Sequence, residues 1–193
     1  MTQATSGQQP TYQTNELNGL PVVRFDGGDI LSCSDNLANS GVFTLFAVAK
    51  VDATGLRSIL DRDGSTAPRI FQFRRFGDNL DLIAFNSSGT VAFVDSQPLP
   101  TSVWAVLTGV RRAAAVQAYV NGASNGATAA DTVNMTGTHP TYMGGFRDNN
   151  GNVIHPNLVG DIAEVIMYDV DLSDTDREAV EGYLAAKYGL TLG

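Results

Sequence analysis

The end of the chain reads 158-LVGDIAEVIMYDVDLSDTDREAVEGYLAAKYGL-190, and this stretch decides the fold. Its first part, up to Tyr168, is rich in β-branched and aromatic residues, as strands are. Ser173 and Asp176 then form a capping box, a pairing that begins a helix. Gly189 follows the last apolar residue at helical spacing and predicts a left-handed stop. The helix is expected to pack on a sheet through an apolar stripe formed by Val180, Tyr183, Leu184 and Tyr188.

Short apolar runs recur along the rest of the chain, about every 10 to 15 residues from Leu20 onward. They are rich in Val, Ile, Phe and Thr and are bounded by Gly, Asn, Asp and Pro, which is typical of strands and turns. Asn121-Gly122 and Asn150-Gly151 are strong hairpin-turn signals. About ten short strands with no helix between them favour antiparallel sheets packed face to face. The predicted fold class is therefore all-β, a two-sheet antiparallel sandwich with one C-terminal α-helix.

The first residues differ from the rest of the chain, because they are polar, contain Pro10 and show no apolar periodicity. They predict an extended arm that need not pack on the domain. We see no internal repeat and no linker after them. The predicted organisation is therefore a polar N-terminal arm over residues 1–17 and a single domain over residues 18–193.

Composition excludes several classes of protein. The 193 residues are 43% hydrophobic and 17% charged, which is enough for a globular core. With 12 basic and 20 acidic residues the net charge is −8, so binding to nucleic acid is not expected. No apolar run approaches the ~20 residues that span a bilayer, so membrane insertion is not expected, and the start carries no secretory signal. The single cysteine, Cys33, excludes an intramolecular disulfide framework.

Several short pieces of the sequence occur in an order that resembles a known family. They are residues 160–190, 18-NGLPVVRFDG-27, 43-FTLFAV-48, Trp104 with Leu107, 118-AYVNG-122 and Gly144-Gly145. Together they resemble LamG-like (laminin G-like) domains of the concanavalin A-like lectin/glucanase superfamily, over about residues 15 to 191.

The resemblance implies a jelly-roll sandwich of two antiparallel sheets, one of them concave. It implies less about function, because this fold hosts lectins, glycosidases, adhesion modules and structural decorations. Similar domains often carry a further strand ahead of the Asn18-Gly19 segment, and here the chain starts too late to hold it. Three alternatives are open: the arm takes the place of that strand, a neighbouring chain supplies it, or the fold forms without it. Since an unpaired edge invites pairing, we expect a homo-oligomer or larger assembly through the N-terminal arm.

Catalysis is not expected. A glycosidase needs two carboxylates that flank the scissile bond, and the glucanases of this superfamily place theirs in a Glu-x-Asp-x-x-Glu run that the chain lacks. Asp161 and Glu164 are three residues apart, so on a regular strand they point to opposite faces. Glu164 then shares its face with Ile162 and Ile166, half-buried and satisfied by an arginine or a backbone donor. Asp61 and Asp63 lie at a strand end and in the turn after it; a plain turn is expected, and the alternative is that they flank a substrate or bind calcium.

The sequence requires no cofactor, but one loop has the composition of a calcium site. Calcium binds about six to eight oxygen atoms from Asp, Asn and backbone carbonyl groups. The loop 148-DNNGN-152 has that composition without the EF-hand spacing. Asp148 and Asn152 are the predicted ligands, and the alternative is a hairpin tip with an Asn-Gly turn.

A sugar site needs an aromatic ring that stacks on the sugar, with planar polar groups beside it. One candidate set gathers near the last hairpin and consists of Tyr142, Phe146, Arg147, Asn149 and His155. A second set consists of Arg62, Arg74, Phe76 and Asn79. The alternative for both sets is a place in the core or in a solvated loop. Trp104 stands at the structural tryptophan position of the family and is expected in the core.

These features favour a non-catalytic recognition or adhesion module that binds a glycan or a protein surface. The alternative is a structural or decoration subunit of a virion or surface assembly, which the polar arm and the missing opening strand favour. A glycan-cleaving enzyme is disfavoured because the sequence lacks a carboxylate pair. The expected location is an extracellular or virion surface.

Overall fold

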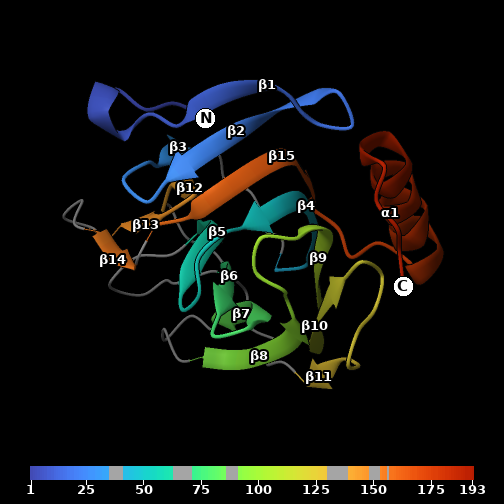
Figure 1. Cartoon of the computed structure of the whole chain (residues 1–193). Coiled ribbons are helices and arrows are strands. Elements are labelled where there is room, and N and C mark those ends of the chain that lie inside the picture. The colour runs from blue at the N-terminus through green and yellow to red at the C-terminus, as the bar shows by residue number, and fades with distance from the viewer. Residues whose placement is uncertain (35–40, 63–70, 86–90, 130–138, 148–152, 156) are drawn as a thin grey trace.

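The computed structural model has two antiparallel sheets packed face to face and one helix on the outside of one of them (Figure 1). It describes residues 1–34, 41–62, 71–85, 91–129, 139–147, 153–155 and 157–193, with the backbone alone for residues 91–95, 128–129 and 153–155. This arrangement confirms the predicted fold class, an all-β jelly-roll sandwich with a C-terminal helix. Among the described residues, no helix is long and apolar enough to span a membrane.

The strands divide unequally between the sheets. The seven-stranded sheet consists, in spatial order, of β1 (Thr11–Leu17), β2 (Leu20–Asp26), β15 (Val159–Tyr168), β4 (Phe43–Val51), β9 (Trp104–Arg112), β10 (Ala115–Val120) and β11 (Thr128–Ala129). The six-stranded sheet consists of β3 (Leu31–Cys33), β12 (Thr141–Met143), β5 (Arg57–Arg62), β6 (Phe71–Phe76), β7 (Asn79–Phe85) and β8 (Val91–Pro98). A separate two-stranded sheet is formed by β13 (Phe146–Arg147) and β14 (Val153–His155).

The core between the sheets comes from alternate residues of both. Phe43 and Leu45 of β4 point inward, as do Phe71 and Phe73 of β6, and all four are buried. The ring centres of Phe43 and Phe71 lie 5.0 Å apart. Gly109 of β9 lies where the sheets approach closely, because a Cβ atom there would be 3.2 Å from the Phe73 ring. This burial supplies most of the stability and leaves the opposite face of each sheet for other contacts.

The helix α1 (Asp174–Tyr188) packs on the outer face of the seven-stranded sheet. Ser173 Oγ accepts a hydrogen bond from the Asp176 N–H at 3.1 Å and donates one to Asp176 Oδ2 at 2.6 Å, so Ser173 is confirmed as the N-cap. Gly189 is left-handed with φ 66°, so the predicted stop is confirmed too. Leu184 is buried against the sheet, as the apolar stripe predicts.

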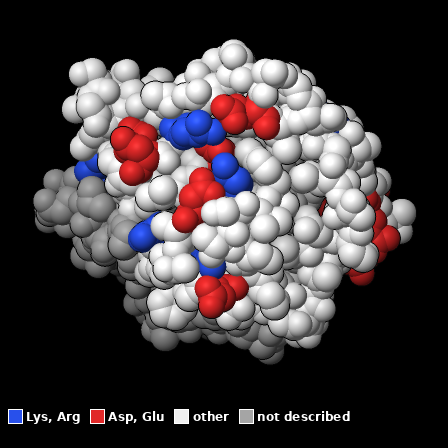
Figure 2. Space-filling view, viewed as in Figure 1, with Lys and Arg blue, Asp and Glu red and all other residues white. Residues whose placement is uncertain are grey.

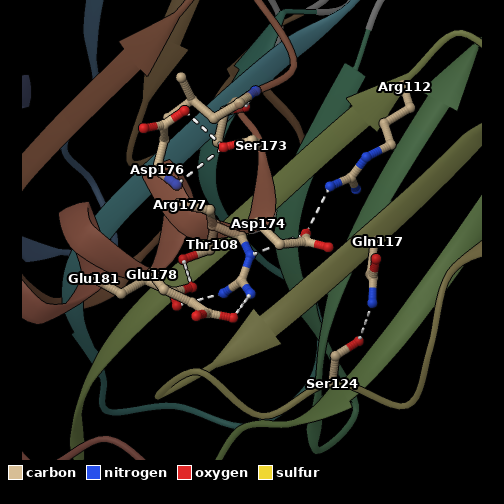
Figure 3. A network of polar contacts seen from close by, with 12 residues as sticks. Thr108, Arg112, Gln117, Ser124, Ser173, Asp174, Asp176, Arg177, Glu178 and Glu181 are labelled. Carbon is tan, nitrogen blue, oxygen red and sulfur yellow. Dashed lines mark hydrogen bonds and ion pairs between the residues drawn. The ribbon is translucent and has the colours of Figure 1, made fainter.

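The buried side of α1 is partly polar, which apolar periodicity does not predict. Tyr183, expected in the stripe, is 53% exposed. Arg177 and Glu181 are buried instead and form an ion pair over β9 (Figure 3). Glu181 also accepts a hydrogen bond from the Thr108 hydroxyl at 2.7 Å, and the Arg177 guanidinium lies 3.9 Å from the centre of the Tyr119 ring. This paired polar network fixes how the helix is rotated on the sheet.

The N-terminal segment is part of the sandwich, which corrects the predicted boundary at residue 17. β1 pairs antiparallel with β2, with Tyr12 opposite Val23. An Asn18-Gly19 turn with positive φ at both residues joins the two strands. β1 therefore takes the place of the strand that the resemblance leaves missing, and it comes from the same chain. The sequence does not predict this strand. β1 lies at a sheet edge and is mostly exposed on both faces, so its residues lack apolar alternation.

Further contacts fasten the N-terminal segment. The Asn18 side-chain amide donates to the Lys187 carbonyl oxygen at 3.0 Å and so caps the C-terminal end of α1. Leu17 is buried in the cluster that joins α1 to the sheet. Upstream, the Ile30 N–H donates to the Gln8 carbonyl oxygen at 3.0 Å. The segment is therefore held at both of its ends.

Deleting residues 1–17 is expected to destabilise the protein. The deletion exposes the edge of β2 and removes the buried side chain of Leu17; losing a buried leucine side chain costs about 2 to 5 kcal/mol. A loss of that size lowers the melting temperature by roughly 4 to 20 °C, which circular dichroism measures. Thr14→Ala, at an exposed position of the same strand, is the control. An unchanged melting temperature for the deletion contradicts this account.

Candidate functional site

Among its described side chains, the outer face of the six-stranded sheet is polar and carries one exposed aromatic ring, Phe76. Because Phe71 and Phe73 point into the core, the alternation of β6 turns Gln72, Arg74 and Phe76 outward. Residues directly opposite each other in an antiparallel pair share a face, so the register of β6, β7 and β8 completes the set. The two rows across these strands are Arg74, Asp81 and Ser96, and Phe76, Asn79 and Pro98.

The solvent-facing part of this surface, here called the Phe76 patch, consists of Phe76, Asn79, Ser96, Pro98 and Asn125. The Phe76 ring is 54% exposed. Asn79 and Ser96 are half-buried, and Pro98 and Asn125 are exposed. The Asn125 amide donates to the Ser96 carbonyl oxygen at 2.9 Å, which brings the loop after β10 to the edge strand β8. The exposed ring therefore shares its face with the amide of Asn79 and the hydroxyl of Ser96, and the amide of Asn125 lies at the sheet edge beside Ser96.

A layer of paired charges supports the patch from below. The carboxylate of Asp81 is buried and accepts a hydrogen bond from Ser96 Oγ at 2.6 Å. Arg74 donates to Gln72 Oε1 at 2.6 Å, and its guanidinium lies 5.2 Å from the centre of the Phe76 ring. Burial raises the pKa of Asp81, against the opposing effects of the Ser96 hydrogen bond and the Arg74 charge. These contacts hold the ring and the hydroxyl in place before any ligand arrives.

A second carboxylate on this face, Asp61, is not a catalytic partner for Asp81. Asp61 lies on β5, where it accepts hydrogen bonds from the Ser58 hydroxyl and from the Phe73 N–H. It therefore lies near the end of the strand, as predicted, and the turn expected after it at Asp63 lies outside the described residues. Asp61 is opposite Gln72 and Asp81 is opposite Arg74, so the two residues lie two strands and two positions apart, roughly 12 Å. Retaining and inverting glycosidases need separations of about 5 Å and about 6.5 to 9.5 Å. Both are buried and hydrogen-bonded, which suits a supporting role.

The first predicted sugar set is not brought together. Tyr142 does lie on the outer face of the six-stranded sheet, half-buried and in register with Asp61. Phe146 is only 1% exposed, so its ring offers no stacking face to solvent. Arg147 points elsewhere and donates to Gln8 Oε1 at 2.9 Å. Tyr142, Phe146 and Arg147 are close in the sequence but do not form one site in the structure.

The rest of that set and the predicted calcium ligands lie outside what the structure describes. Asp148, Asn149 and Asn152 fall between the described segments, and the side chain of His155 is not described. Among the described residues, no group of three or more His, Cys, Asp or Glu side chains is arranged to hold a metal. The calcium site at Asp148 and Asn152 therefore stays a prediction.

The structure brings together three of the four residues of the second predicted sugar set. Arg74, Phe76 and Asn79 share the outer face, as strand alternation indicates. Arg62 is fully buried, and its Nε donates to the His139 carbonyl oxygen at 3.2 Å. The sequence reasoning missed the other contributors to the face, which are Asp81, Ser96, Pro98 and Asn125. The pairing register of β7 with β8 identifies the first three, and no short sequence motif reports it.

A second charged surface lies on the outer face of the seven-stranded sheet. Figure 2 shows basic and acidic side chains side by side over the region of β2, β15 and β4. The buried Asp161 carboxylate binds Arg24 Nε at 2.7 Å and Lys50 Nζ at 2.9 Å. Burial alone would raise the pKa of Asp161, but these hydrogen bonds outweigh it and hold the pKa below its ordinary value. Lys50 Nζ also lies 5.6 Å from the centre of the Trp104 ring, which is half-buried here and not in the core between the sheets.

Asp161 and Glu164 lie on this same face, which corrects the prediction that they point to opposite faces. The register of β15 against β4 shifts between Ile162 and Glu164, and this bulge inserts one extra residue. Ile162 points into the core between the sheets, so it does not share a face with Glu164 as predicted. Glu164 is half-buried as predicted, with Lys187 Nζ at 2.9 Å as its partner. Both carboxylates are held by cations, an arrangement that serves stability.

Comparison with known proteins places the fold. Residues 25–176 match the family model described as the concanavalin A-like lectin/glucanases superfamily. No curated protein matches the sequence. Domain 4 of an extracellular arabinanase from Geobacillus stearothermophilus, in complex with arabinotriose, is 16% identical with a TM-score of 0.66, covering 92% of this chain and 84% of that chain.

Two further solved structures share the fold. The CBM40 of an IT-sialidase from Ruminococcus gnavus, bound to α2,3-sialyllactose, is 17% identical with a TM-score of 0.68, covering 83% of this chain and 96% of that chain. The binding domain of botulinum neurotoxin DC, in complex with rat synaptotagmin II, is 10% identical with a TM-score of 0.67. It covers 91% of this chain, which spans only 46% of that one. At these identities the likeness shows the fold alone, and the similar domains are binding domains.

Proposed function

The chain belongs to the concanavalin A-like lectin/glucanase superfamily, and from this premise we propose that it is a non-catalytic module that binds carbohydrate through the Phe76 patch. The observation that carries the proposal is the exposed Phe76 ring, with Asn79 and Ser96 on the same face and Asn125 at the sheet edge next to Ser96. A pyranose or furanose ring has an apolar C–H surface and a rim of hydroxyl groups. An aromatic ring bordered by amides and a hydroxyl complements both parts.

The support beneath the patch favours binding as well. Arg74 lies against the Phe76 ring, and Asp81 holds the Ser96 hydroxyl. A ligand that meets side chains already in place loses less affinity to ordering them. The similar domains bound to arabinotriose and to sialyllactose are consistent with a carbohydrate ligand. A carbohydrate-binding module of this kind belongs at an extracellular or virion surface, which is the location we propose.

Two alternatives have less support. Hydrolysis needs an acid and a second carboxylate in one cleft, whereas Asp61 and Asp81 are buried and lie two strands apart. The structural-subunit alternative drew on a loose arm and a missing opening strand, and β1 fills that place within the chain. A protein ligand, as in the toxin domain bound to synaptotagmin, remains an outcome of the experiment below.

Phe76→Ala is expected to weaken carbohydrate binding at least about tenfold, equivalent to ~1.4 kcal/mol, because it removes the stacking face. A glycan array on the purified chain, with calcium and with chelator, first identifies the best-bound sugar. Titration calorimetry then measures that sugar on the wild type and on the variant. Loss of binding in chelator would show that calcium is needed, and Asp148→Ala and Asn152→Ala would then test the predicted calcium ligands.

Tyr12→Ala is the matched control for Phe76→Ala. Tyr12 is also a well-exposed aromatic residue, at 68%, but it lies on β1 of the other sheet. The control is expected to bind as the wild type does. Equal affinity of wild type and Phe76→Ala rules out this patch as the site. A folded protein that binds no glycan at all rules out the proposed function and directs attention to protein ligands.

A further inference from the structure

We infer that the Phe76 patch selects uncharged sugars over acidic ones, an inference that rests on the carbohydrate-binding function proposed above. The first observation is which groups the patch presents to solvent. These are an aromatic ring, the amides of Asn79 and Asn125, the hydroxyl of Ser96 and the ring of Pro98. None of them carries a charge, and each suits a hydroxyl group or a C–H surface.

The cation nearest to the patch is already committed. The side chain of Arg74 is 14% exposed, donates to Gln72 Oε1 at 2.6 Å and lies against the Phe76 ring. Its Nε also lies 3.9 Å from the buried carboxylate of Asp81. A sugar carboxylate is bound best by a guanidinium that offers two parallel N–H groups. Arg74 does not present that fork to solvent.

The exposed charge at the edge of the patch is negative. Asp78 lies in the turn between β6 and β7, two residues from Phe76, and its side chain is 87% exposed. Its partner Arg75 binds it at 2.8 Å but is itself buried, so the carboxylate is the group that solvent meets. Among the described residues of β6, β7 and their turn, no exposed basic side chain offsets it. An acidic sugar on the ring therefore approaches a like charge.

The test compares sugars of both classes on the same protein. Arabinotriose, cellotriose and lactose are the uncharged probes, and trigalacturonate and α2,3-sialyllactose are the acidic ones. Lactose and sialyllactose form a matched pair that differs only in the acidic residue. The expected result is that at least one uncharged probe binds, and that no acidic probe binds within about tenfold of it. Binding of the uncharged probe should change little between low and high salt, because no ion pair is involved.

Asp78→Asn adds a second readout, with Asp171→Asn as the control at another exposed aspartate. The Asp78 variant is expected to improve binding of the acidic probes roughly two- to threefold and to leave the uncharged ones unchanged. Tighter binding of an acidic probe, lost in Phe76→Ala, overturns this inference while the proposed function stands. Binding of neither class to the folded protein overturns both.

Discussion

Gly160→Ala should destabilise the fold strongly. Gly160 lies in β15, paired with both β2 and β4, and has φ +149°, which other residues rarely adopt. A Cβ atom there would lie 2.1 Å from the Lys50 carbonyl oxygen, a backbone atom that cannot turn aside. A clash of this kind inside a central strand costs roughly 4 kcal/mol or more. Urea denaturation followed by tryptophan fluorescence measures the loss.

Gly182→Ala is the matched control for Gly160→Ala. Gly182 lies in α1, and a Cβ atom there meets nothing within 4 Å. Alanine is the better helix former, so this variant is expected to be stabilised by about 0.5 to 1 kcal/mol. If Gly160→Ala unfolds at the same urea concentration as the wild type, the path of β15 described above is wrong.

Asp161→Asn is expected to cost about 2 to 3 kcal/mol at pH 7, because it removes the charge that Arg24 and Lys50 bind. The cost should depend on pH. The folded pKa of Asp161 lies below its ordinary value, despite burial, because of hydrogen bonds from these two cations. A depressed pKa adds stability above the unfolded value of about 3.9, and that stability disappears as the pH falls through the folded pKa. The difference in free energy of unfolding between wild type and variant should therefore become smaller below about pH 4.

The measurement is the urea midpoint of both proteins at several pH values from 7 down to 3. Asp171→Asn, the same chemical change at an exposed aspartate, is expected to leave the midpoint nearly unchanged at pH 7. A gap for Asp161→Asn that stays constant across this range contradicts the role given to its charge. Equal urea midpoints at every pH would mean that the ion pairs of Asp161 with Arg24 and Lys50 add no stability.

Local patterns predicted some elements well. The N-cap at Ser173 and the stop at Gly189 were predictable because they depend on a few neighbouring residues. The paired glycines also have a clear cause. A Cβ atom on Gly144 would lie 2.3 Å from the Phe25 ring, and one on Gly145 would lie 2.5 Å from the side chain of Asn157. The cap and the stop are local signals, whereas the two glycines were noted only through the family resemblance, because the contacts that require them come from distant parts of the chain.

Other features depend on pairing, which one sequence does not report. β1 is exposed on both faces, so nothing in its composition marks it as a strand. A one-residue bulge after Ile162 moves Glu164 to the face of Asp161, the opposite of what regular alternation predicts. The Phe76 patch needs the register of β7 with β8 to place Ser96 on the same face as the ring. Phe76 itself was found because alternation along a single strand was enough.

The most direct test of the account is to map bound sugar onto the protein by NMR. The uncharged oligosaccharide with the highest affinity is titrated into the ¹⁵N-labelled chain. The account predicts that the largest shifts fall on the backbone amides of Phe76, Asn79, Ser96 and Asn125. Shifts that cluster instead on residues 142–155, or on β1 and α1, would place the ligand elsewhere and contradict the assignment of this face.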